Sequence, residues 1–378
     1  MKRNLMIIAG EASGDLHGAS LILELKKLDK DLEIYGIGGD KMKAAGMNIL
    51  YHINKMAFLG FAEIIKHLPF IRKVQNDLLK VVKEKNIRNV VLIDYPGFNL
   101  SIAKKLKARG VKIFYYISPQ IWAWGAGRIK KIKKLVNKML VVFPFEKELY
   151  KNAGVDVEFV GHPLLERISE YNFLSREELY KKFNLQEGKD ILLILSGSRN
   201  HEVEKIFPES IKAAEKLAGE FNLQIVAACS SNIDENIFYS ISGSRNFKVI
   251  KGYTYDLLMH SKIGIVKSGT STLEAGLFRL PMVIVYKTSY LTYLIGKSLV
   301  KVDSIGMANI IAGEKVAPEL IQNEVSKDSI YNECKKILSD PSLYNSIRNK
   351  LSVIKEKLGS EGASFRAAKI IHASLNEA

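Results

Sequence analysis

The sequence predicts an α/β protein made of two Rossmann-like domains, and three observations lead to this prediction. The chain has 378 residues, and single cores stop growing near roughly 250–300 residues, so two domains are expected. Short buried apolar runs alternate with amphipathic helical stretches, a pattern typical of parallel sheets covered by helices on both faces. The same pattern restarts after Gly161, His162 and Pro163.

The order of these elements sets the expected domain limits. The predicted strands cover residues 5–9, 90–93, 113–116, 139–142, 191–195, 223–227, 248–250, 263–266 and 282–285. Predicted helices between them include residues 16–28, 102–109 and 129–136. We expect an N-terminal domain over 1–165, a C-terminal domain over 166–340, and helices over 341–378 that pack back across the domains. Ligands of open parallel sheets bind outside the carboxyl ends of the strands, so two facing domains would form a cleft between their loops.

Composition and charge narrow the class of partner. Lys and Arg total 56 against 40 Asp and Glu, a formal net charge of +16. This excess favours a nucleic acid, an anionic membrane face or a phosphorylated substrate, although a solvated Lys-rich surface would give the same count. Two cysteines, Cys229 and Cys334, cannot form a disulfide framework and indicate a reducing compartment.

The N-terminus does not read as an export signal. Its apolar run is only about five residues long and ends at Gly10 and Glu11, whereas a signal peptide needs an apolar region of roughly 7–15 residues. We also find no run of about 18 apolar residues that would span a membrane. A cytoplasmic protein is therefore expected.

The loop after the first predicted strand carries several reactive groups. Small residues there let a substrate approach the backbone, and the following helix N-terminus attracts anions. Glu11, Asp15 and His17 are the ionisable groups, and Ser13 and Gly14 lie between them. The alternative is that Ser13 or Asp15 only caps the helix.

Cofactor and metal signals are weak. A second Gly-rich turn is expected at residues 36–40, but the third glycine of a dinucleotide fingerprint would fall at Lys41. This pattern excludes a nicotinamide cofactor. Asp29 and Asp31 match an Asp-x-Asp pair only formally, and the histidines show no ligand spacing. We expect neither a cofactor nor a metal.

A further candidate feature is a carboxylate at the end of a predicted strand. The predicted strand 90–93 delivers Asp94 at its carboxyl end, followed by Pro96 and by Asn99, which is a candidate substrate-binding residue. A carboxylate in that position is well placed to take a proton from an attacking hydroxyl. The alternative is that Asp94 caps the helix after Pro96.

Two loops of the second half suit a nucleotide diphosphate. Strand 191–195 runs into Ser198 and Arg199, and a guanidinium beside a small-residue turn and a helix start is a good diphosphate site. Strand 263–266 runs into a second such helix start, whose hydroxyls and amides could hold phosphate oxygens and whose carboxylate could bind a ribose diol. Its candidate residues are Gly269, Thr270, Ser271, Thr272 and Glu274.

Two segments resemble a membrane or acyl-chain contact, because large apolar residues lie beside cations. The first is 56–71, for which a core helix is the alternative; the second precedes a basic helix with Arg128, Lys130, Lys131, Lys133 and Lys134. The candidate contact residues are Phe58, Leu59, Phe61, Ile64, Ile65, Leu68, Phe70, Trp122 and Trp124.

Taken together, the loops resemble the lipid-A-disaccharide synthases, glycosyltransferase family 19. The motifs that carry the resemblance are residues 9–15, 94–99, 116–124, 143–146, 160–162, 197–199, 268–274 and 309–313. The resemblance implies a GT-B fold and an inverting, metal-independent transfer. The donor would be UDP-2,3-diacylglucosamine and the acceptor 2,3-diacylglucosamine 1-phosphate, giving a β(1→6) disaccharide and UDP in lipid A biosynthesis. It also implies a peripheral protein on the inner face of the inner membrane of a Gram-negative cell, and a possible homodimer.

Within that resemblance, Asp94 is the first choice as general base and His17 the second, with Glu11 beside them. Arg199 and the helix start at 269–272 would stabilise the departing UDP, Glu274 would hold its ribose, and Asn309 would belong to the substrate site. Two alternatives remain open: another UDP-sugar GT-B enzyme such as a UDP-N-acetylglucosamine 2-epimerase, and a basic membrane-binding protein without catalysis. The basic residues form no recognisable nucleic-acid motif, so no nucleic-acid partner is expected.

Overall fold

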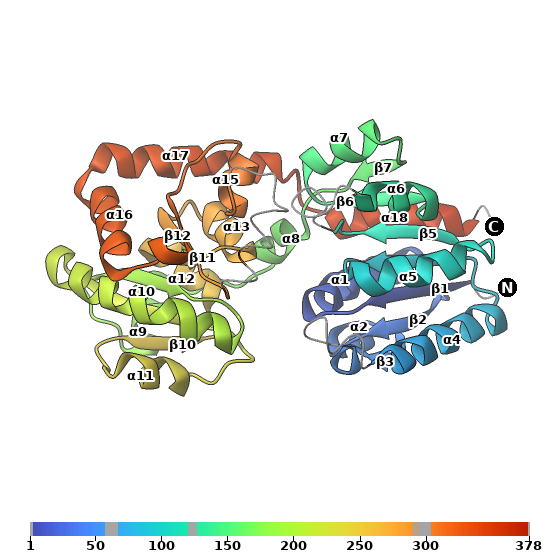
Figure 1. The fold of residues 1–378 in the computed structure, drawn as a ribbon, viewed down its shortest axis with the longest axis horizontal. Helices are drawn as coiled ribbons and strands as arrows, with labels where there is room; N and C mark the ends of the chain where they lie inside the picture. The colour runs from blue at the N-terminus through green and yellow to red at the C-terminus, as the bar shows by residue number, and fades with distance from the viewer. Residues whose placement is uncertain (1–2, 57–66, 120–126, 290–292, 294–303, 377–378) are drawn as a thin grey trace. The chain divides into compact units, whose positions relative to one another are not determined.

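The computed structural model describes residues 3–56, 67–119, 127–289, 293 and 304–376. The chain forms two compact units: unit 1 comprises Met1–Arg167 with Leu358–Ala378, and unit 2 comprises Ile168–Lys357. Each unit has its own parallel sheet (Figure 1).

The sheet of unit 1 has seven strands in the order β3-β2-β1-β4-β5-β6-β7. Every neighbouring pair runs parallel. The strands are β1 Asn4–Ala9, β2 Glu33–Gly38, β3 Asn48–His52, β4 Asn89–Ile93, β5 Lys112–Tyr116, β6 Lys138–Val141 and β7 Val157–Phe159.

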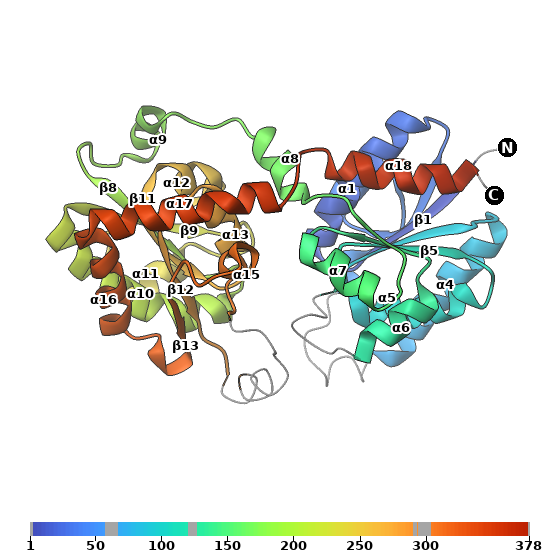
Figure 2. The ribbon, with the colours of Figure 1, turned by 90° about the horizontal axis from the view of Figure 1, so that it is seen from above.

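Helices cover both faces of this sheet, because right-handed crossovers place them on opposite sides as the strand order reverses. Helices α1 and α18 lie side by side on one face, and α4, α5 and α6 lie on the other (Figure 2). The helices of unit 1 are α1 Ala12–Leu28, α2 Asp40–Ala44, α4 Leu68–Glu84, α5 Pro96–Lys107, α6 Gly127–Leu135, α7 Pro144–Asn152 and α18 Ala363–Asn376. Helix α8, Pro163–Ser169, contains the boundary between the two units.

Unit 2 repeats this plan with six parallel strands in the order β10-β9-β8-β11-β12-β13. The strands are β8 Asp190–Leu195, β9 Leu223–Cys229, β10 Lys248–Lys251, β11 Ser261–Lys267, β12 Met282–Tyr286 and β13 Glu319–Ile321. Its helices are α9 Arg176–Phe183, α10 Asn200–Phe221, α11 Asn236–Ser242, α12 Thr254–His260, α13 Thr270–Leu277, α15 Met307–Ala312, α16 Lys327–Ser339 and α17 Pro341–Lys357.

The two C-terminal helices divide between the units. Helix α17 belongs to unit 2, and α18 belongs to unit 1. The Arg366 guanidinium of α18 donates to the carbonyl of Val160 at 2.8 Å and to that of Ser360 at 2.7 Å. These bonds attach the last helix to the strand end and linker of unit 1.

All nine strands predicted above are present, and each begins and ends within two residues of its predicted limits. The prediction of a Gly-rich turn at 36–40 is wrong, because Gly36 and Gly38 belong to β2. At Gly36, φ is +146°, and an added Cβ would lie 1.9 Å from the Ile7 carbonyl oxygen. This glycine therefore serves close strand packing rather than a turn.

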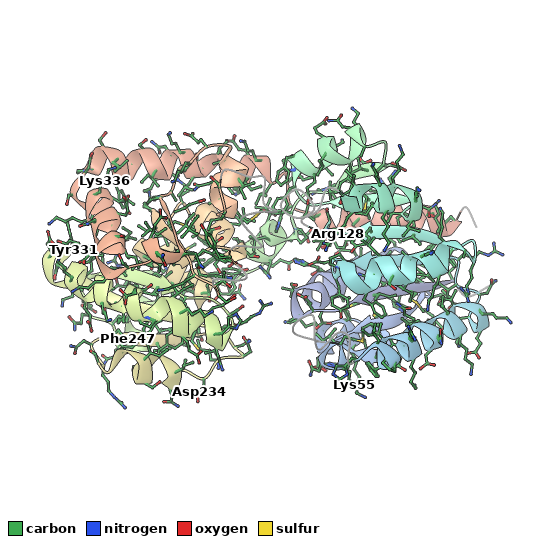
Figure 3. The ribbon with its side chains drawn as sticks, viewed as in Figure 1. Lys55, Arg128, Asp234, Phe247, Tyr331 and Lys336 are labelled. Carbon is green, nitrogen blue, oxygen red and sulfur yellow. The ribbon has the colours of Figure 1, made fainter. Side chains whose placement is uncertain are left out.

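Burial separates the interior from the charged surface in both units. Phe247 and Tyr331 are buried in unit 2, whereas Lys55 and Arg128 of unit 1 and Lys336 of unit 2 are exposed (Figure 3). Among the helices that the structure describes, none has the length and apolar character to cross a bilayer.

Candidate functional site

The loop at Gly10 and Glu11 and the Asp94 loop meet at the switch point of the unit 1 sheet. Strands β1 and β4 are neighbours, with Ala9 paired to Ile93, and the strand order runs in opposite directions on either side of them. Both loops therefore leave the sheet at its carboxyl edge, side by side. Open α/β sheets bind their ligands at this position.

The two loops are in direct contact through Gly10 and Tyr95. A Cβ placed on Gly10 would lie 2.2 Å from Cδ1 of Tyr95, so only glycine leaves room for the ring. The Tyr95 hydroxyl donates to the carbonyl of Met56 at 2.9 Å. The position of Tyr95, and with it the turn that begins at Asp94, is thus held on two sides.

Asp94 has the properties of a general base. Burial, followed by the charge of Glu11, raises the pKa of Asp94 to about 6, although a backbone hydrogen bond near Tyr95 opposes the shift. Glu11 itself is exposed. A carboxylate with a pKa near 6 is ionised at neutral pH and is a stronger base than an ordinary aspartate.

Backbone strain gathers at the same edge of the sheet. Asp94 (φ 42°), Tyr95 (φ 46°) and Ile117 (φ 63°) all have left-handed conformations, and Ile117 follows the strand that neighbours β4. Such conformations cost about 1–3 kcal/mol each in non-glycine residues and occur preferentially at functional sites. Tyr95 is the N-cap of α5, so Asp94 does not cap that helix.

Of the substrate-binding residues predicted on this loop, Asp15 and Gly14 have structural contacts, whereas Ser13 faces solvent. The Asp15 carboxylate accepts the N–H groups of Gly39 at 2.6 Å, Lys41 at 3.2 Å and Met42 at 3.0 Å. It therefore caps the start of α2, whereas the N-cap of its own helix α1 is Glu11. Gly14 is buried beside Ala9, whose Cβ an added Cβ would approach to 3.1 Å. Ser13 is exposed.

His17 lies in a different electrostatic environment. Burial and the Arg167 charge lower the pKa of His17 to about 4, and burial, His17 and Arg167 lower that of His162 to about 3. His162 accepts the Leu164 N–H through Nδ1 at 3.1 Å. Both imidazoles are neutral at physiological pH, and His17 is a weaker base than Asp94.

The switch point of unit 2 brings together the two loops expected to hold a nucleotide. Strands β8 and β11 are neighbours, with Leu195 paired to Val266. The loop after β8 presents exposed Ser198 and Arg199 at the start of the 22-residue helix α10. Two helix N-termini and one guanidinium thus lie at the edge where open α/β sheets usually bind their ligands.

Sequence reasoning did not identify Lys267 as part of this site. Its Nζ lies 2.9 Å from Oε1 of Glu202, whose Oε2 accepts the Ser198 N–H at 2.9 Å. Burial acts to raise the pKa of Glu202, but Lys267 and the Ser198 hydrogen bond hold it below its ordinary value. A cation that ends a strand directly before a Gly-rich helix start was the available sequence signal.

The hydroxyls at the start of α13 differ in their accessibility. Thr272 is buried and donates to the Gly269 carbonyl at 2.8 Å, whereas Thr270 is exposed and Ser271 half-buried. Gly269 has φ +144°, which favours glycine. Glu274 accepts a 3.4 Å hydrogen bond from Tyr255.

Asn309 is 1% exposed, and its amide is engaged within unit 2. Its Oδ1 accepts the N–H groups of Val316 and Ala317 at 2.9 Å, and its Nδ2 donates to Glu319 and to the Ala317 carbonyl at 2.8 Å. This residue holds the loop before β13, and any effect on a substrate would be transmitted through that loop.

Most of the predicted membrane-contact residues lie outside the described residues: Phe58, Leu59, Phe61, Ile64, Ile65, Trp122 and Trp124. Of the others, Leu68 is 39% exposed, and Phe70 packs edge-on against Tyr51 with ring centroids 6.0 Å apart. The five cations predicted for the basic helix lie on α6 and all are exposed: Arg128, Lys130, Lys131, Lys133 and Lys134.

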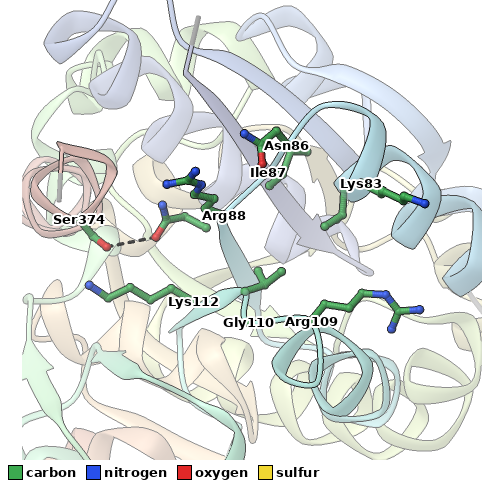
Figure 4. A pocket seen from close by; sticks show the side chains of 11 residues that line it. Lys83, Asn86, Ile87, Arg88, Arg109, Gly110, Lys112 and Ser374 are labelled. Carbon is green, nitrogen blue, oxygen red and sulfur yellow. Dashed lines mark hydrogen bonds between the residues drawn. The ribbon is translucent and has the colours of Figure 1, made fainter. Parts of the chain in front are cut away.

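A cavity of about 610 Å³ lies at the opposite edge of the unit 1 sheet, where β4 and β5 begin (Figure 4). Lys83, Arg88, Arg109 and Lys112 line it, and Ser374 of α18 donates to Asn89 on its wall at 3.1 Å. Lys83 and Arg109 lie at the ends of α4 and α5, where cations complement the helix dipole. This cavity is not at the ligand-binding edge of the sheet, and we assign it no part in the site.

Known proteins are similar to this chain over nearly its whole length. The model of a family described as lipid-A-disaccharide synthetase matches residues 5–371. The chain belongs to the lipid-A-disaccharide synthase family. It is 42% identical over 370 residues to the lipid-A-disaccharide synthase of Geobacter sulfurreducens, covering 97% of this chain and 96% of that protein. It is 38% identical over 371 residues to that of Coxiella burnetii strain CbuG_Q212, covering 98% of each.

Solved structures show that this member of the lipid-A-disaccharide synthase family has a GT-B fold. A calicheamicin glycosyltransferase is similar with a TM-score of 0.64 and 15% identity, covering 99% of this chain and 98% of that one. A UDP-N-acetylglucosamine 2-epimerase from Neisseria meningitidis, bound to UDP-N-acetylglucosamine, has a TM-score of 0.66 and 14% identity, covering 99% and 100%. At these identities the likeness concerns the fold alone, whereas the family membership rests on the synthases.

Proposed function

We propose that this protein transfers 2,3-diacylglucosamine from UDP-2,3-diacylglucosamine to 2,3-diacylglucosamine 1-phosphate, releasing UDP. Its membership of the lipid-A-disaccharide synthase family supports the reaction. The observation that carries the mechanism is Asp94, a carboxylate with a pKa of about 6 at the switch point of the unit 1 sheet.

The transfer proceeds by one inverting displacement without a metal. The 6-hydroxyl of the acceptor attacks the anomeric carbon of the donor while Asp94 takes its proton. The bond between the anomeric carbon and the UDP oxygen breaks, and UDP leaves as an anion. Arg199 and the N-termini of α10 and α13 stabilise that charge, Glu274 accepts from the ribose, and Ser13 contacts the bound sugar or phosphate.

The first test measures UDP release in detergent micelles, with and without the acceptor. Acceptor-dependent release together with a disaccharide product is expected. UDP release at the same rate with and without the acceptor would contradict the proposal.

Asp94→Asn keeps the size of the side chain but removes the base, so kcat should fall at least about 100-fold while UDP affinity changes little. Arg199→Ala should instead weaken UDP binding. Near-normal turnover of Asp94→Asn would exclude Asp94 as the base.

We further propose that the protein attaches to the cytoplasmic face of the membrane through α6 and the apolar segment 56–71. Each Lys or Arg near an anionic bilayer contributes about 1 kcal/mol, an attraction that salt screens. Binding to vesicles with anionic lipid should therefore weaken between low and high salt. The double substitution Lys130→Glu with Lys131→Glu should reduce binding strongly.

The matched control changes the same charge elsewhere, through Lys336→Glu with Lys355→Glu, two exposed lysines of unit 2. Equal loss of binding in both double variants would mean that net charge, rather than α6, determines attachment. Salt-insensitive binding would mean that electrostatic attraction to the lipid contributes little. Sedimentation of the protein with vesicles measures both.

A further inference from the structure

The backbone of Asp94 is held at both of its polar groups. Its N–H donates to the Tyr116 carbonyl at 3.2 Å. Its carbonyl oxygen accepts two side-chain hydrogen bonds, from the Tyr115 hydroxyl at 2.5 Å and from Nδ2 of Asn99 at 2.7 Å. A residue in the left-handed region persists there only when its surroundings determine its conformation, and these three bonds provide that determination.

The two side-chain donors are themselves fixed and inaccessible. Tyr115 and Asn99 are both 0% exposed. Tyr115 lies on β5 within the apolar core between the sheet and α4, α5 and α6. Asn99 lies in the first turn of α5 and also donates to the Ile93 carbonyl at 3.1 Å. Neither side chain reaches the surface on which a substrate would bind.

The Tyr115 hydroxyl remains a donor throughout the working range of the protein. Burial, and then the charge of Asp94, raise the pKa of Tyr115 well above its ordinary value. The hydroxyl therefore keeps its proton, and its hydrogen bond to the Asp94 carbonyl does not depend on pH.

We propose that Tyr115 and Asn99 are positioning residues that hold the Asp94 carbonyl. By holding it they keep the Asp94 backbone in its left-handed conformation, and this conformation directs the Asp94 carboxylate toward the acceptor hydroxyl. This inference rests on the proposed role of Asp94 as general base. The direction of a side chain follows from the φ and ψ of its residue, so loss of the two bonds lets Asp94 relax toward an ordinary extended conformation. Displacement of a reacting group by about 1 Å costs on the order of 100-fold in rate.

The test compares Tyr115→Phe with Tyr150→Phe in steady-state kinetics of the full-length protein. Tyr150 is a matched control, because it is also 0% exposed and its hydroxyl pairs with Ser118 at 2.8 Å instead of with the Asp94 carbonyl. Tyr115→Phe should lower kcat about 10- to 100-fold and leave both KM values nearly unchanged. Tyr150→Phe should retain wild-type kcat, even if its melting temperature falls by as much as that of Tyr115→Phe.

The pH profile supplies a readout that a purely structural role would not move. Burial is the main cause of the raised pKa of Asp94, so a carboxylate that relaxes toward solvent should titrate lower. The acidic limb of kcat should therefore shift to lower pH in Tyr115→Phe and not in Tyr150→Phe. Asn99→Ala should act on the same carbonyl, and the double variant should lose less than the product of the two single effects.

Wild-type kcat and pH profile in Tyr115→Phe would overturn the inference. A loss of activity through KM alone would also overturn it, because it would place Tyr115 in substrate binding. Asp94→Asn separates this failure from failure of the proposed mechanism. If Asp94→Asn is inactive and Tyr115→Phe has normal activity, only the positioning role is contradicted. If Asp94→Asn is active, Asp94 is not the general base and the proposed mechanism is contradicted.

Discussion

At the residue scale, the Asp94 carboxylate is governed by its burial and by the charge of Glu11 at the neighbouring strand end. Burial disfavours the ionised form of a carboxylate, and a nearby negative charge adds to that effect. The pKa of Asp94 is consequently raised to about 6, with the Glu11 charge as the second cause after burial. A general base must be ionised, so activity should rise with pH through this value.

Glu11→Gln tests this coupling. Removing the Glu11 charge should lower the pKa of Asp94, because ionisation of Asp94 then meets less repulsion. The acidic limb of kcat/KM, near pH 6 in the native protein, should move to lower pH. Measurement of kcat/KM between pH 4.5 and 8, ~0.5 unit apart, follows this limb. Glu24→Gln, which removes the same charge from a later turn of α1, is the control. An unmoved limb in Glu11→Gln would show that the Glu11 charge does not contribute to the pKa of Asp94.

At the scale of elements, unit 2 depends on close approach of α13 and α17. Gly276 of α13 faces Ile354 of α17, and an added Cβ would lie 2.4 Å from its Cδ1. The Ala308 Cβ on α15 would lie 3.5 Å away. Helix α13 is thus closely packed on this side, and a larger residue at Gly276 would require the terminal methyl group of Ile354 to shift.

Gly276→Ala should therefore destabilise unit 2 by about 1–3 kcal/mol, the usual cost of overpacking a core. Adding Ile354→Val removes the methyl group nearest the new side chain and should recover part of that loss. Urea unfolding of the two single variants and the double variant measures the coupling. Additive effects would mean that Gly276 and Ile354 do not compete for the same space.

At the scale of the whole molecule, the chain leaves unit 1 after Arg167 and returns to it at Leu358. Helix α18 then packs against α1, the helix that follows the Glu11 loop. Its buried residues include Ala363, Ala367, Ala368, Ile371 and Leu375. The stability of the N-terminal unit thus depends on the last residues of the sequence.

A chain that ends at Lys357 should lose stability in unit 1 and keep it in unit 2. Burial of Ile371 and Leu375 alone is worth about 1.5–3 kcal/mol each, which lowers the melting temperature of a unit this size by roughly 10 °C. Calorimetry with UDP present, which should stabilise only unit 2, distinguishes the transitions. A chain that ends at Asn376 keeps α18 and is the control; equal melting of both chains would contradict the dependence.

The sequence by itself determined most of the local elements and the family, and it predicted a chemistry for several loops. Alternation of apolar runs was sufficient for nine strands, because buried parallel strands are apolar throughout. It gave no limits for β2, and it missed the short strands β3, β7 and β13, whose residues are mostly only partly buried. The motif residues Asp94, Arg199 and Glu274 were all identifiable from their places at strand ends and helix starts.

Only the tertiary structure decided which loops meet and which polar groups are free to act. Strand order places β1 beside β4 and β8 beside β11, and it depends on packing between segments far apart in the chain. The same packing buries Asp15 and Asn309 in hydrogen bonds and places Tyr115 and Lys267 against the site. Burial is a property of the whole fold, so the pKa of Asp94 and the roles of these four residues follow from the folded chain and not from local sequence.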